Sequence, residues 1–292
     1  MLQIPRAALR TGLVTTAYPN EPDMPPPAFR GRPEIDPSRC DLSGACVSAC
    51  PSGVISIEDV GSGARRWQLD LAGCVFCGLC SETCPTGAMS MGKSFELATR
   101  TREDLLTIVD HLPDGAATPT ASRRAAQPSG QTAASRFSAA IHRVLRRSLH
   151  IRHMDAGSDN STDWEISALL SPVYDIQRLG LDVVASPRHA DVLLVTGAIT
   201  RNLEVALLDT YNAMPEPRIV VAAGAEACGG GVLRGAYAVA GGADRVVPVD
   251  VYVPGDPPRP HALIFGLLLA VERIEQKQHL THRHKRLSTA PS

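Results

Sequence analysis

Seven of the eight cysteines in this 292-residue chain lie between Cys40 and Cys84. The later group, from Cys74 to Pro85, has the spacing C-x2-C-x2-C-x3-C-P, in which three cysteines hold one iron-sulfur cube and the fourth is a ligand of another. Three thiolates within seven residues need a tightly turned backbone, which Gly78 permits. The spacing therefore predicts a segment that binds iron-sulfur clusters and carries electrons.

The same pattern occurs 34 residues earlier in the chain, with serine in one ligand position. The earlier repeat consists of Cys40, Ser43, Cys46, Cys50 and Pro51. Because the last cysteine of each repeat points toward the other cluster, we expect one [4Fe-4S] cluster on Cys50, Cys74, Cys77 and Cys80. We expect the second site on Cys40, Cys46 and Cys84, holding either a [3Fe-4S] cluster or a [4Fe-4S] cluster with the Ser43 oxygen as its fourth ligand. An empty second site is the alternative.

Two other uses of the cysteines fit the sequence less well. Tetrahedral zinc prefers two pairs of ligands over three closely set cysteines and a distant one. Disulfides at this density are typical of small secreted domains. The beginning of the sequence, with Pro5, Arg6 and Arg10, is a poor signal peptide, so we expect an intracellular, reduced protein.

Composition limits the other classes of function. The chain is 44% hydrophobic with a formal charge of −1, which indicates a buried core, two domains and no general affinity for nucleic acid. The longest apolar run, Ala262 to Val271, is shorter than the roughly 20 residues that span a bilayer. We find no nucleophile and base pair, so no catalytic residue is expected, and Gly229 to Gly231 lack the spacing of a phosphate loop.

The first part of the chain is predicted to be an arm followed by the cysteine repeats. Residues 1–18 are expected to form a short helix, and Pro19 to Pro33 an extended arm. Strands are expected at 54–57 and 67–71, joined by a glycine turn. The segment 113–135, rich in Ala, Pro, Ser and Thr, is expected to be a flexible linker.

The second part is predicted to alternate helices and buried strands around a mainly parallel sheet. A basic amphipathic helix over 137–148 would lie on a membrane or partner, or dock on its own domain. Helices are expected over 164–179, 202–213 and 261–275, and strands over 181–185, 191–195, 219–223 and 245–249. The basic tail after Lys277 is expected to be a disordered end.

Two families resemble these two parts. Residues 10–106 resemble the two-cluster ferredoxin-like subunit of respiratory complex I and formate hydrogenlyase, through Thr11-Gly12, Tyr18-Pro19, Phe29-Arg30-Gly31, the cysteine repeats and Phe95-Glu96-Leu97. Residues 147–278 are similar to the cluster-bearing small subunit of the same complexes. The matching residues are Ser186 to Asp191, Leu194 to Gly197, Thr200-Arg201, Pro248 to Tyr252, Pro254-Gly255 and Pro257-Pro258.

The resemblance implies two usually separate subunits fused in one chain. The expected fold is an α+β two-[4Fe-4S] ferredoxin-like domain followed by an α/β flavodoxin-like domain with a mainly parallel sheet. The expected boundaries are 1–112 for the arm and ferredoxin-like domain, 113–135 for the linker, 136–276 for the small-subunit domain and 277–292 for the tail.

The small-subunit resemblance fails at its metal ligands. In the family four cysteines hold one [4Fe-4S] cluster, but the corresponding positions here are Asp159, Thr162, Glu226 and Asp256. Cys228 lies two residues beyond the third position and cannot hold a cluster alone, so a cluster-free domain is expected. The three carboxylates would bind a cation or a proton, or would simply be solvated.

The resemblance implies an iron-sulfur electron-transfer subunit of a membrane-associated complex related to complex I or energy-converting hydrogenase. Its partners would be a large subunit, membrane subunits and a redox donor protein. It would lie in the cytoplasm, peripherally on the inner face of the cell membrane. The alternative is a structural or regulatory subunit through which electrons no longer flow.

Overall fold

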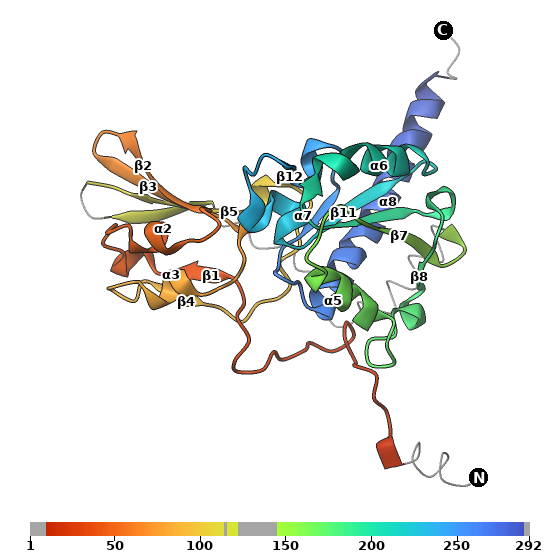
Figure 1. The fold of residues 1–292 in the computed structure, drawn as a ribbon, viewed down its shortest axis with the longest axis horizontal. Coiled ribbons are helices and arrows are strands. Elements are labelled where there is room, and N and C mark those ends of the chain that lie inside the picture. The colour runs from red at the N-terminus through yellow and green to blue at the C-terminus, as the bar shows by residue number, and fades with distance from the viewer. Residues whose placement is uncertain (1–9, 114–115, 122–144, 289–292) are drawn as a thin grey trace.

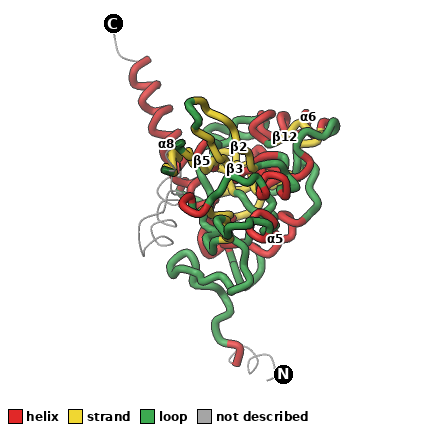
Figure 2. The backbone as a smooth tube through the Cα atoms, turned by 90° about the vertical axis from the view of Figure 1, so that its left-hand side faces the viewer, coloured by secondary structure: helices red, strands yellow, loops and turns green. Residues whose placement is uncertain are grey.

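The computed structural model describes residues 10–113, 116–121 and 145–288, and shows two bodies side by side (Figure 1). The smaller body contains the cysteine repeats, and the larger body surrounds a parallel sheet and the long helix α8. Seen from the side of the smaller body, the end of α8 and the N-terminal arm project in opposite directions (Figure 2).

The smaller body consists of short helices between two antiparallel sheets. One sheet pairs β1 with β4, and the other has the order β2-β3-β5-β6. The strands are β1 Pro33–Ile35, β2 Ile55–Gly61, β3 Ala64–Asp70, β4 Met89–Met91, β5 Leu106–His111 and β6 Ala117–Ala121. The helices are η1 Pro37–Arg39, α2 Ala45–Ala49, η2 Leu71–Gly73, α3 Leu79–Glu82 and η3 Glu103–Leu105.

The expected linker begins later than the sequence suggested. Strand β6 lies inside the segment 113–135 and pairs with β5, and neither strand was predicted from the sequence. Its backbone N–H and C=O groups find partners on the free edge of β5, and composition alone does not reveal such pairing. The rest of the expected linker, from residue 122, lies outside the described residues, as does most of the expected helix over 137–148.

The larger body contains a five-stranded sheet in which every neighbouring pair is parallel. The order is β13-β11-β9-β7-β8. Its strands are β7 Leu149–Asp155, β8 Leu181–Val183, β9 Val192–Thr196, β11 Ile219–Ala223 and β13 Val251–Val253, and a separate ribbon pairs β10 Ile199–Thr200 with β12 Val239–Gly241. The helices are α5 Ser161–Leu169, η4 Ile176–Leu179, η5 Pro187–His189, α6 Arg201–Asn212, α7 Ala225–Gly229, η6 Gly231–Leu233, η7 Ala243–Arg245 and α8 Pro260–Ser288.

The two faces of the sheet belong to two different cores. Val192 and Leu194 of β9 point into a core with the apolar residues of α8, whereas Leu193 and Val195 point into the core on the other face. Side chains alternate along a strand, and both faces are covered, which explains why β9 reads as an uninterrupted apolar run. The second core continues into the smaller body, where it includes the fully buried Trp67, so the two bodies share packed apolar side chains.

Three expected elements of the larger body differ in the structure. The helix predicted over 164–179 is interrupted near Pro172, which cannot continue a helix, so that α5 and η4 are separate. The strand predicted over 245–249 is wrong, because Pro248 lacks a backbone N–H and the strand forms later, at β13. The tail after Lys277, expected to be disordered, continues α8 to Ser288.

Two further observations concern the ends of the chain and the membrane. Residues 1–9 of the helix expected over 1–18 lie outside the described residues, and of residues 10–18 only Arg10 and Thr11 are helical, so the prediction is wrong for residues 12–18. Within the part of the chain that the structure describes, no helix is both long and apolar enough to cross a bilayer.

Candidate metal centre

The cysteines of the two repeats line two separate hollows. Cys50, Cys74, Cys77 and Cys80 line one, which we call the four-cysteine hollow. Cys40, Cys46 and Cys84, together with Ser43, line the other, which we call the three-cysteine hollow. Each hollow takes cysteines from both repeats, and this is the grouping that the sequence spacing predicts.

The backbone follows the same path through both repeats. Asp36 and Asp70 each cap a short 3-10 helix by accepting a hydrogen bond from a backbone N–H two residues later. Cys40 and Cys74 end those helices, and four residues further on Gly44 and Gly78 adopt left-handed conformations with φ of 76° and 86°. These glycines start α2 and α3, which carry Cys46 and Cys80.

Ser43 therefore occupies in the first repeat the place that Cys77 occupies in the second. The residue before each is left-handed as well, Leu42 with φ of 56° and Phe76 with φ of 52°. The serine thus replaces a cysteine on a preserved turn, and a hydroxyl oxygen is a harder donor for iron than a thiolate.

The four-cysteine hollow is a donor set that fits an iron-sulfur cluster. Burial raises the pKa of the Cys74 thiol to about 12 and that of Cys80 to about 11, and the neighbouring thiols add to both shifts. Buried thiolates are unfavourable without a positive partner, and iron bound by four thiolates supplies one. Among the described residues, no three His, Cys, Asp or Glu side chains converge closely enough to hold a single metal ion.

Hydrogen bonds to sulfur occur in both hollows. The backbone N–H of Phe76 donates to Cys74 Sγ over 3.5 Å. Cys50 Sγ lies 3.7 Å from the Ser52 hydroxyl, and Cys84 Sγ lies 3.6 Å from the Thr86 hydroxyl. Hydrogen bonds of this kind to cluster sulfur ligands tune the reduction potential.

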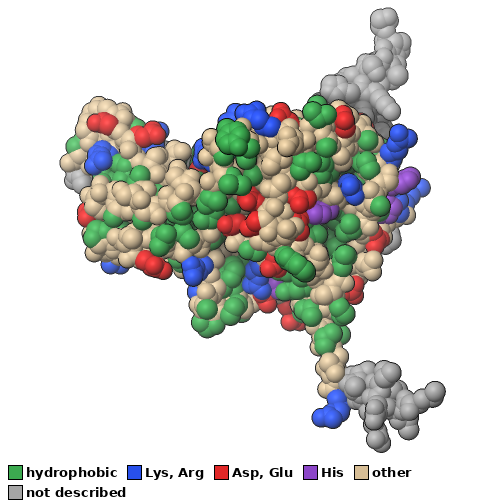
Figure 3. Space-filling view, in the orientation of Figure 1, with side chains coloured by type: hydrophobic (Ala, Val, Ile, Leu, Met, Phe, Trp, Pro, Cys, Tyr) green, Lys and Arg blue, Asp and Glu red, His purple; other side chains and the backbone are tan. Residues whose placement is uncertain are grey.

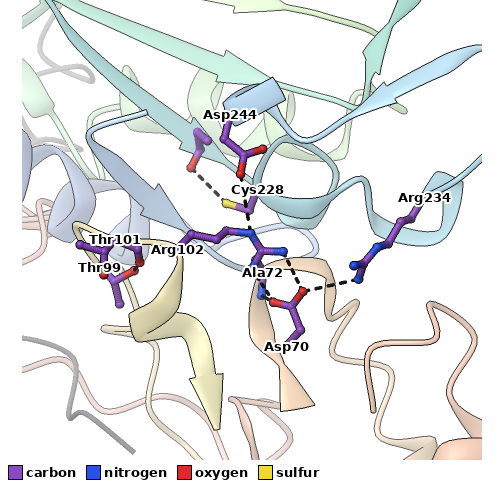
Figure 4. Close-up of polar contacts among 9 residues, drawn as sticks. Asp70, Ala72, Thr99, Thr101, Arg102, Cys228, Arg234 and Asp244 are labelled. Atoms are coloured by element: carbon purple, nitrogen blue, oxygen red, sulfur yellow. Dashed lines mark hydrogen bonds and ion pairs between the residues drawn. The ribbon is translucent and has the colours of Figure 1, made fainter. Parts of the chain in front are cut away.

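A network of ion pairs joins the cluster-binding repeats to the larger body (Figure 4). Asp70, at the end of β3, accepts two hydrogen bonds from Arg102 over 2.5 and 2.7 Å. Arg234 lies 3.5 Å from the same carboxylate, and Arg102 lies 3.9 Å from Asp244. Asp70 also accepts from the Ala72 N–H, which fixes the turn that leads to Cys74. One carboxylate thus holds the cluster loop and the contact between the bodies.

This network was not predicted from the sequence, although the 34-residue repeat contains a partial signal for it. Asp36 and Asp70 lie 34 residues apart, as do the cysteines, so a capping role for both could have been inferred from the repeat. The partners of Asp70, Arg102 and Arg234, come from remote segments that no local pattern connects. Cys228 is fully buried beside them and donates to the Ala222 carbonyl over 3.3 Å.

The structure brings the four replaced ligand positions of the larger body together. We call Asp159, Thr162, Glu226 and Asp256 the acidic loop cluster. Thr162 Oγ1 lies against Gly224 at the start of α7, where a Cβ would come within 2.8 Å of it, and the Gly255 carbonyl adjoins the same glycine. Acidic side chains gather over α5 and α7 in the middle of the face that Figure 3 shows.

Burial and mutual repulsion perturb the carboxylates of this cluster. Burial first, and then Asp159 and Asp256, raise the pKa of Glu226 to about 7. Burial and Asp159 raise the pKa of Asp256 to about 6. Hydrogen bonds from Ser161 lower the pKa of Asp159. The cluster therefore holds fewer negative charges at neutral pH than its three carboxyl groups suggest.

Comparisons with known proteins agree with the two parts of the chain. Residues 34–88 match the family described as "4Fe-4S dicluster domain", and residues 160–270 match the family described as "NADH ubiquinone oxidoreductase, 20 Kd subunit". The dicluster match establishes one or two [4Fe-4S] clusters as the cofactors of this chain, as the cysteine spacing predicted.

Two curated relatives are similar to about half of this chain. Formate hydrogenlyase subunit 7 of Escherichia coli (strain K12) is 43% identical over 141 residues, which are 48% of this chain and 55% of the relative. The probable membrane-bound hydrogenase subunit mbhJ of Pyrococcus furiosus is 43% identical over 136 residues, which are 47% of this chain and 81% of the relative. The match thus spans little more than half the length of the first relative.

A solved structure, titled as that of the membrane-bound sulfane sulfur reductase, an archaeal respiratory membrane complex, contains a chain 33% identical to this one. The match covers 48% of this chain and 75% of that chain, with a TM-score of 0.41. The resemblance to a ferredoxin-like subunit and a small subunit is confirmed by the two family matches and the curated relatives. The chain belongs to the family of the NADH ubiquinone oxidoreductase 20 Kd subunit and carries a 4Fe-4S dicluster domain in front of it.

Proposed function

We propose that this chain is an iron-sulfur electron-transfer subunit of a membrane-associated complex related to respiratory complex I or energy-converting hydrogenase. The observation that carries the proposal is the sorting of seven cysteines into two hollows, each of which draws on both repeats. The family membership of both parts supports it.

The proposed ligands follow the two hollows. A regular [4Fe-4S] cluster is held by Cys50, Cys74, Cys77 and Cys80. The second cluster is held by Cys40, Cys46 and Cys84, as a [3Fe-4S] cluster or as a [4Fe-4S] cluster completed by the Ser43 oxygen. The preserved turn at Ser43 supports this second site, because three thiols keep the arrangement that they have in the intact repeat.

The larger body serves in this proposal as a docking scaffold without a cluster. Oxygen ligands at the acidic loop cluster suit hard cations better than a sulfide-bridged iron cube. The proposed boundaries are those expected from the sequence, 1–112, 113–135, 136–276 and 277–292, except that β6 (Ala117–Ala121) belongs to the first domain. The strand order of the parallel sheet supports a flavodoxin-like fold. When its five strands are numbered along the chain, they lie across the sheet in the order 2-1-3-4-5.

The proposed partners are a large subunit, membrane subunits and a redox donor protein. The names of the relatives, a formate hydrogenlyase subunit and a membrane-bound hydrogenase subunit, support this assembly. The proposed place is the cytoplasm, peripheral to the inner face of the cell membrane. Two exposed apolar side chains near the acidic loop cluster, Trp164 and Val232, support docking of a partner subunit on this side of the larger body.

The second candidate is a structural or regulatory subunit through which electrons do not flow. The observation that favours it is the lack of a cysteine among the four replaced ligand positions. The two candidates differ in one measurable property, since the complex purified through this chain loses its oxidoreductase activity on Cys77→Ala only if electrons pass through the four-cysteine hollow. A Cys77→Ala complex that assembles and keeps full activity supports the structural candidate.

The metal content of the whole chain tests the cluster-free scaffold. Anaerobically purified and reconstituted protein should contain about seven or eight irons per chain, since the dicluster domain accounts for all of them. About twelve irons would contradict the proposal. As the matched variant, cysteines placed together at Asp159, Thr162, Glu226 and Asp256 should add about four irons if the loops still form a cluster cavity.

A further inference from the structure

A cavity of about 440 Å³ lies between the two bodies, next to the four-cysteine hollow. Its walls come from the N-terminal arm at Phe29 and Arg30, from the cluster loop at Phe76 and Cys77, and from the loop that ends at Arg259. This volume is within the range of small-molecule sites, which are mostly apolar with a few placed polar groups. Of the residues that line the cavity, Asp256 alone also belongs to the acidic loop cluster.

The lining combines aromatic rings with positive charge. Phe29, Phe76 and Phe95 supply three rings. The guanidinium of Arg259 lies over the rings of Phe29 and Phe95, with its central carbon 5.4 and 4.8 Å from their centroids. Aromatic walls favour a flat unsaturated ring system, because such rings stack on one another.

The positively charged side chain of Arg259 has a buried hydrogen-bond donor without a partner among the described residues. Arg259 Nη2 donates to Asp23 over 2.6 Å, but its Nη1 is buried with no hydrogen-bond partner among the described residues. Arg30, exposed at the rim, donates to the Cys77 carbonyl. Helix α8 begins at Pro260, next to Arg259, so its N-terminal end adds a partial positive charge. Two arginines and a helix N-terminus face two acids, Asp256 in the lining and Asp23 paired with Arg259, and the unpartnered Nη1 leaves a buried donor for an anionic group.

We propose that this cavity binds a planar aromatic molecule that carries an anionic group, and that such a molecule accepts electrons from the cluster held in the four-cysteine hollow. The electron-transfer part rests on the proposed function, whereas the binding does not. Cys77 lines both the cavity and the hollow, so a bound ring lies beside a cluster ligand. The site gives electrons an exit that does not need a cluster in the larger body.

The transfer balances with a two-electron acceptor of the flavin or quinone class. A reduced cluster held by the four cysteines would supply one electron at a time to the bound ring. With the donor protein restoring each electron, the ring would take up two electrons and two protons from water. No bond to the protein forms or breaks.

Flavin mononucleotide and riboflavin form a matched pair of probes, because they differ only in the phosphate. Equilibrium dialysis against the whole chain, with flavin quantified in both chambers, should show flavin mononucleotide bound about tenfold more tightly, as expected for a charge-assisted phosphate contact. Arg30→Gln should remove most of that difference. Arg39→Gln, an exposed arginine that donates to the Thr86 carbonyl outside the cavity, should not. Equal binding of the two flavins to the wild-type chain would overturn the anionic part of the proposal.

A blocked cavity separates this site from binding elsewhere. Ser94 is exposed at the wall of the cavity, and Ser94→Trp should reduce binding of flavin mononucleotide at least tenfold. Ser90→Trp, exposed on β4 and outside the cavity, is the control and should bind as the wild type. Unchanged binding to Ser94→Trp overturns the site, and iron content confirms that both variants are folded.

The electron-transfer step has its own readout. Protein reduced with dithionite and freed from excess reductant is mixed anaerobically with flavin mononucleotide, and the return of cluster absorbance is followed. Ser94→Trp should reoxidise about tenfold more slowly than Ser90→Trp at a flavin concentration below saturation. Equal rates, with binding lost, would show that electrons leave elsewhere. A chain without iron that still binds the nucleotide would contradict the proposed function and leave the binding site standing.

Discussion

Gly229, the last residue of α7, lies against the backbone of Gly73, so that a Cβ at Gly229 would come within 2.9 Å of the Gly73 nitrogen. Gly73 precedes Cys74, a proposed cluster ligand, and α7 carries Glu226 of the acidic loop cluster. The two bodies therefore meet backbone to backbone at this point. An added side chain at Gly229 would meet backbone atoms, which cannot rotate away as a neighbouring side chain could.

Gly229→Ala should destabilise the protein by about 1–3 kcal/mol, because the added methyl meets backbone atoms of Ala72 and Gly73. It should also alter the EPR signal of the cluster at Cys74. Gly73→Ala meets a methyl group of Val54 instead and should cost less. Denaturant unfolding under anaerobic conditions measures both changes, and equal costs for the two variants would contradict the backbone contact.

Arg102→Met should destabilise the protein by about 2–4 kcal/mol, because it leaves the largely buried Asp70 carboxylate with the Ala72 N–H and the longer contact to Arg234 as its partners. Arg66→Met is the control. Arg66 makes a similar double contact with Asp110, but within one sheet and with a more exposed guanidinium, so about 1 kcal/mol or less is expected. Urea midpoints at one ionic strength compare the pair, and a greater loss from Arg66→Met would refute the ranking.

Glu226→Gln should raise the melting temperature at pH 8 and change it little at pH 5. The folded-state pKa of Glu226, about 7, lies above its ordinary value of 4.5, so its contribution to stability is present at low pH and is lost as the pH rises through about 7. The neutral amide of Gln removes the negative charge at position 226, which burial and the neighbouring carboxylates make unfavourable in the folded state. Glu58→Gln, at an exposed position on β2, should give no such dependence. A Glu226→Gln variant that is less stable at pH 8 would contradict the sign.

Ser43→Cys should convert the site at the three-cysteine hollow to a regular [4Fe-4S] cluster, with iron near eight per chain and a second reduced-state EPR signal. The reason is that the turn at Ser43 matches the turn at Cys77. Ser48→Cys adds a thiol on helix α2, which follows the turn at Ser43, but outside the hollow, so it should leave the spectrum unchanged. An identical response of the two variants would mean that position 43 is not a ligand position.

Cys77→Ala should remove the reduced-state EPR signal of the regular cluster, because one of four thiolates in the four-cysteine hollow is lost. Cys228→Ala is the control, since that buried thiol bonds to the Ala222 carbonyl and lines neither hollow. Anaerobic EPR after dithionite reduction gives the answer. An unchanged signal in Cys77→Ala would remove Cys77 from the ligand set.

The parts of the structure that sequence could predict are those set by local pattern. Strand β11 has the bounds expected from its apolar run, because a buried strand in a parallel sheet needs such a run on both faces. The cysteine hollows follow from spacing and one left-handed glycine in each repeat. The apolar run around Pro248 misled the strand prediction, since hydrophobicity does not register a missing N–H.

The contacts between the bodies could not be predicted from local pattern. Asp70 and Arg234 are 164 residues apart, and their approach depends on how α7 packs against η2. The cavity at Cys77 depends likewise on the position of the arm at Phe29, which looks in sequence like any proline-rich segment. Such pairings are decided by the packing of whole elements, and a single sequence carries no record of them.

The turn at Ser62 between β2 and β3 divides the chain into pieces that each supply cysteines to both hollows. A protease cut at this turn would therefore not release a fragment from the metal-loaded protein, because iron would bridge the pieces twice. Removal of the iron by a chelator would leave the β2–β3 and β1–β4 hydrogen bonds, the polar contacts of the segment before β2 and the packed core to hold the pieces together. The clusters in this chain are thus crosslinks as well as electron carriers, and their loss should lower the stability of the smaller body.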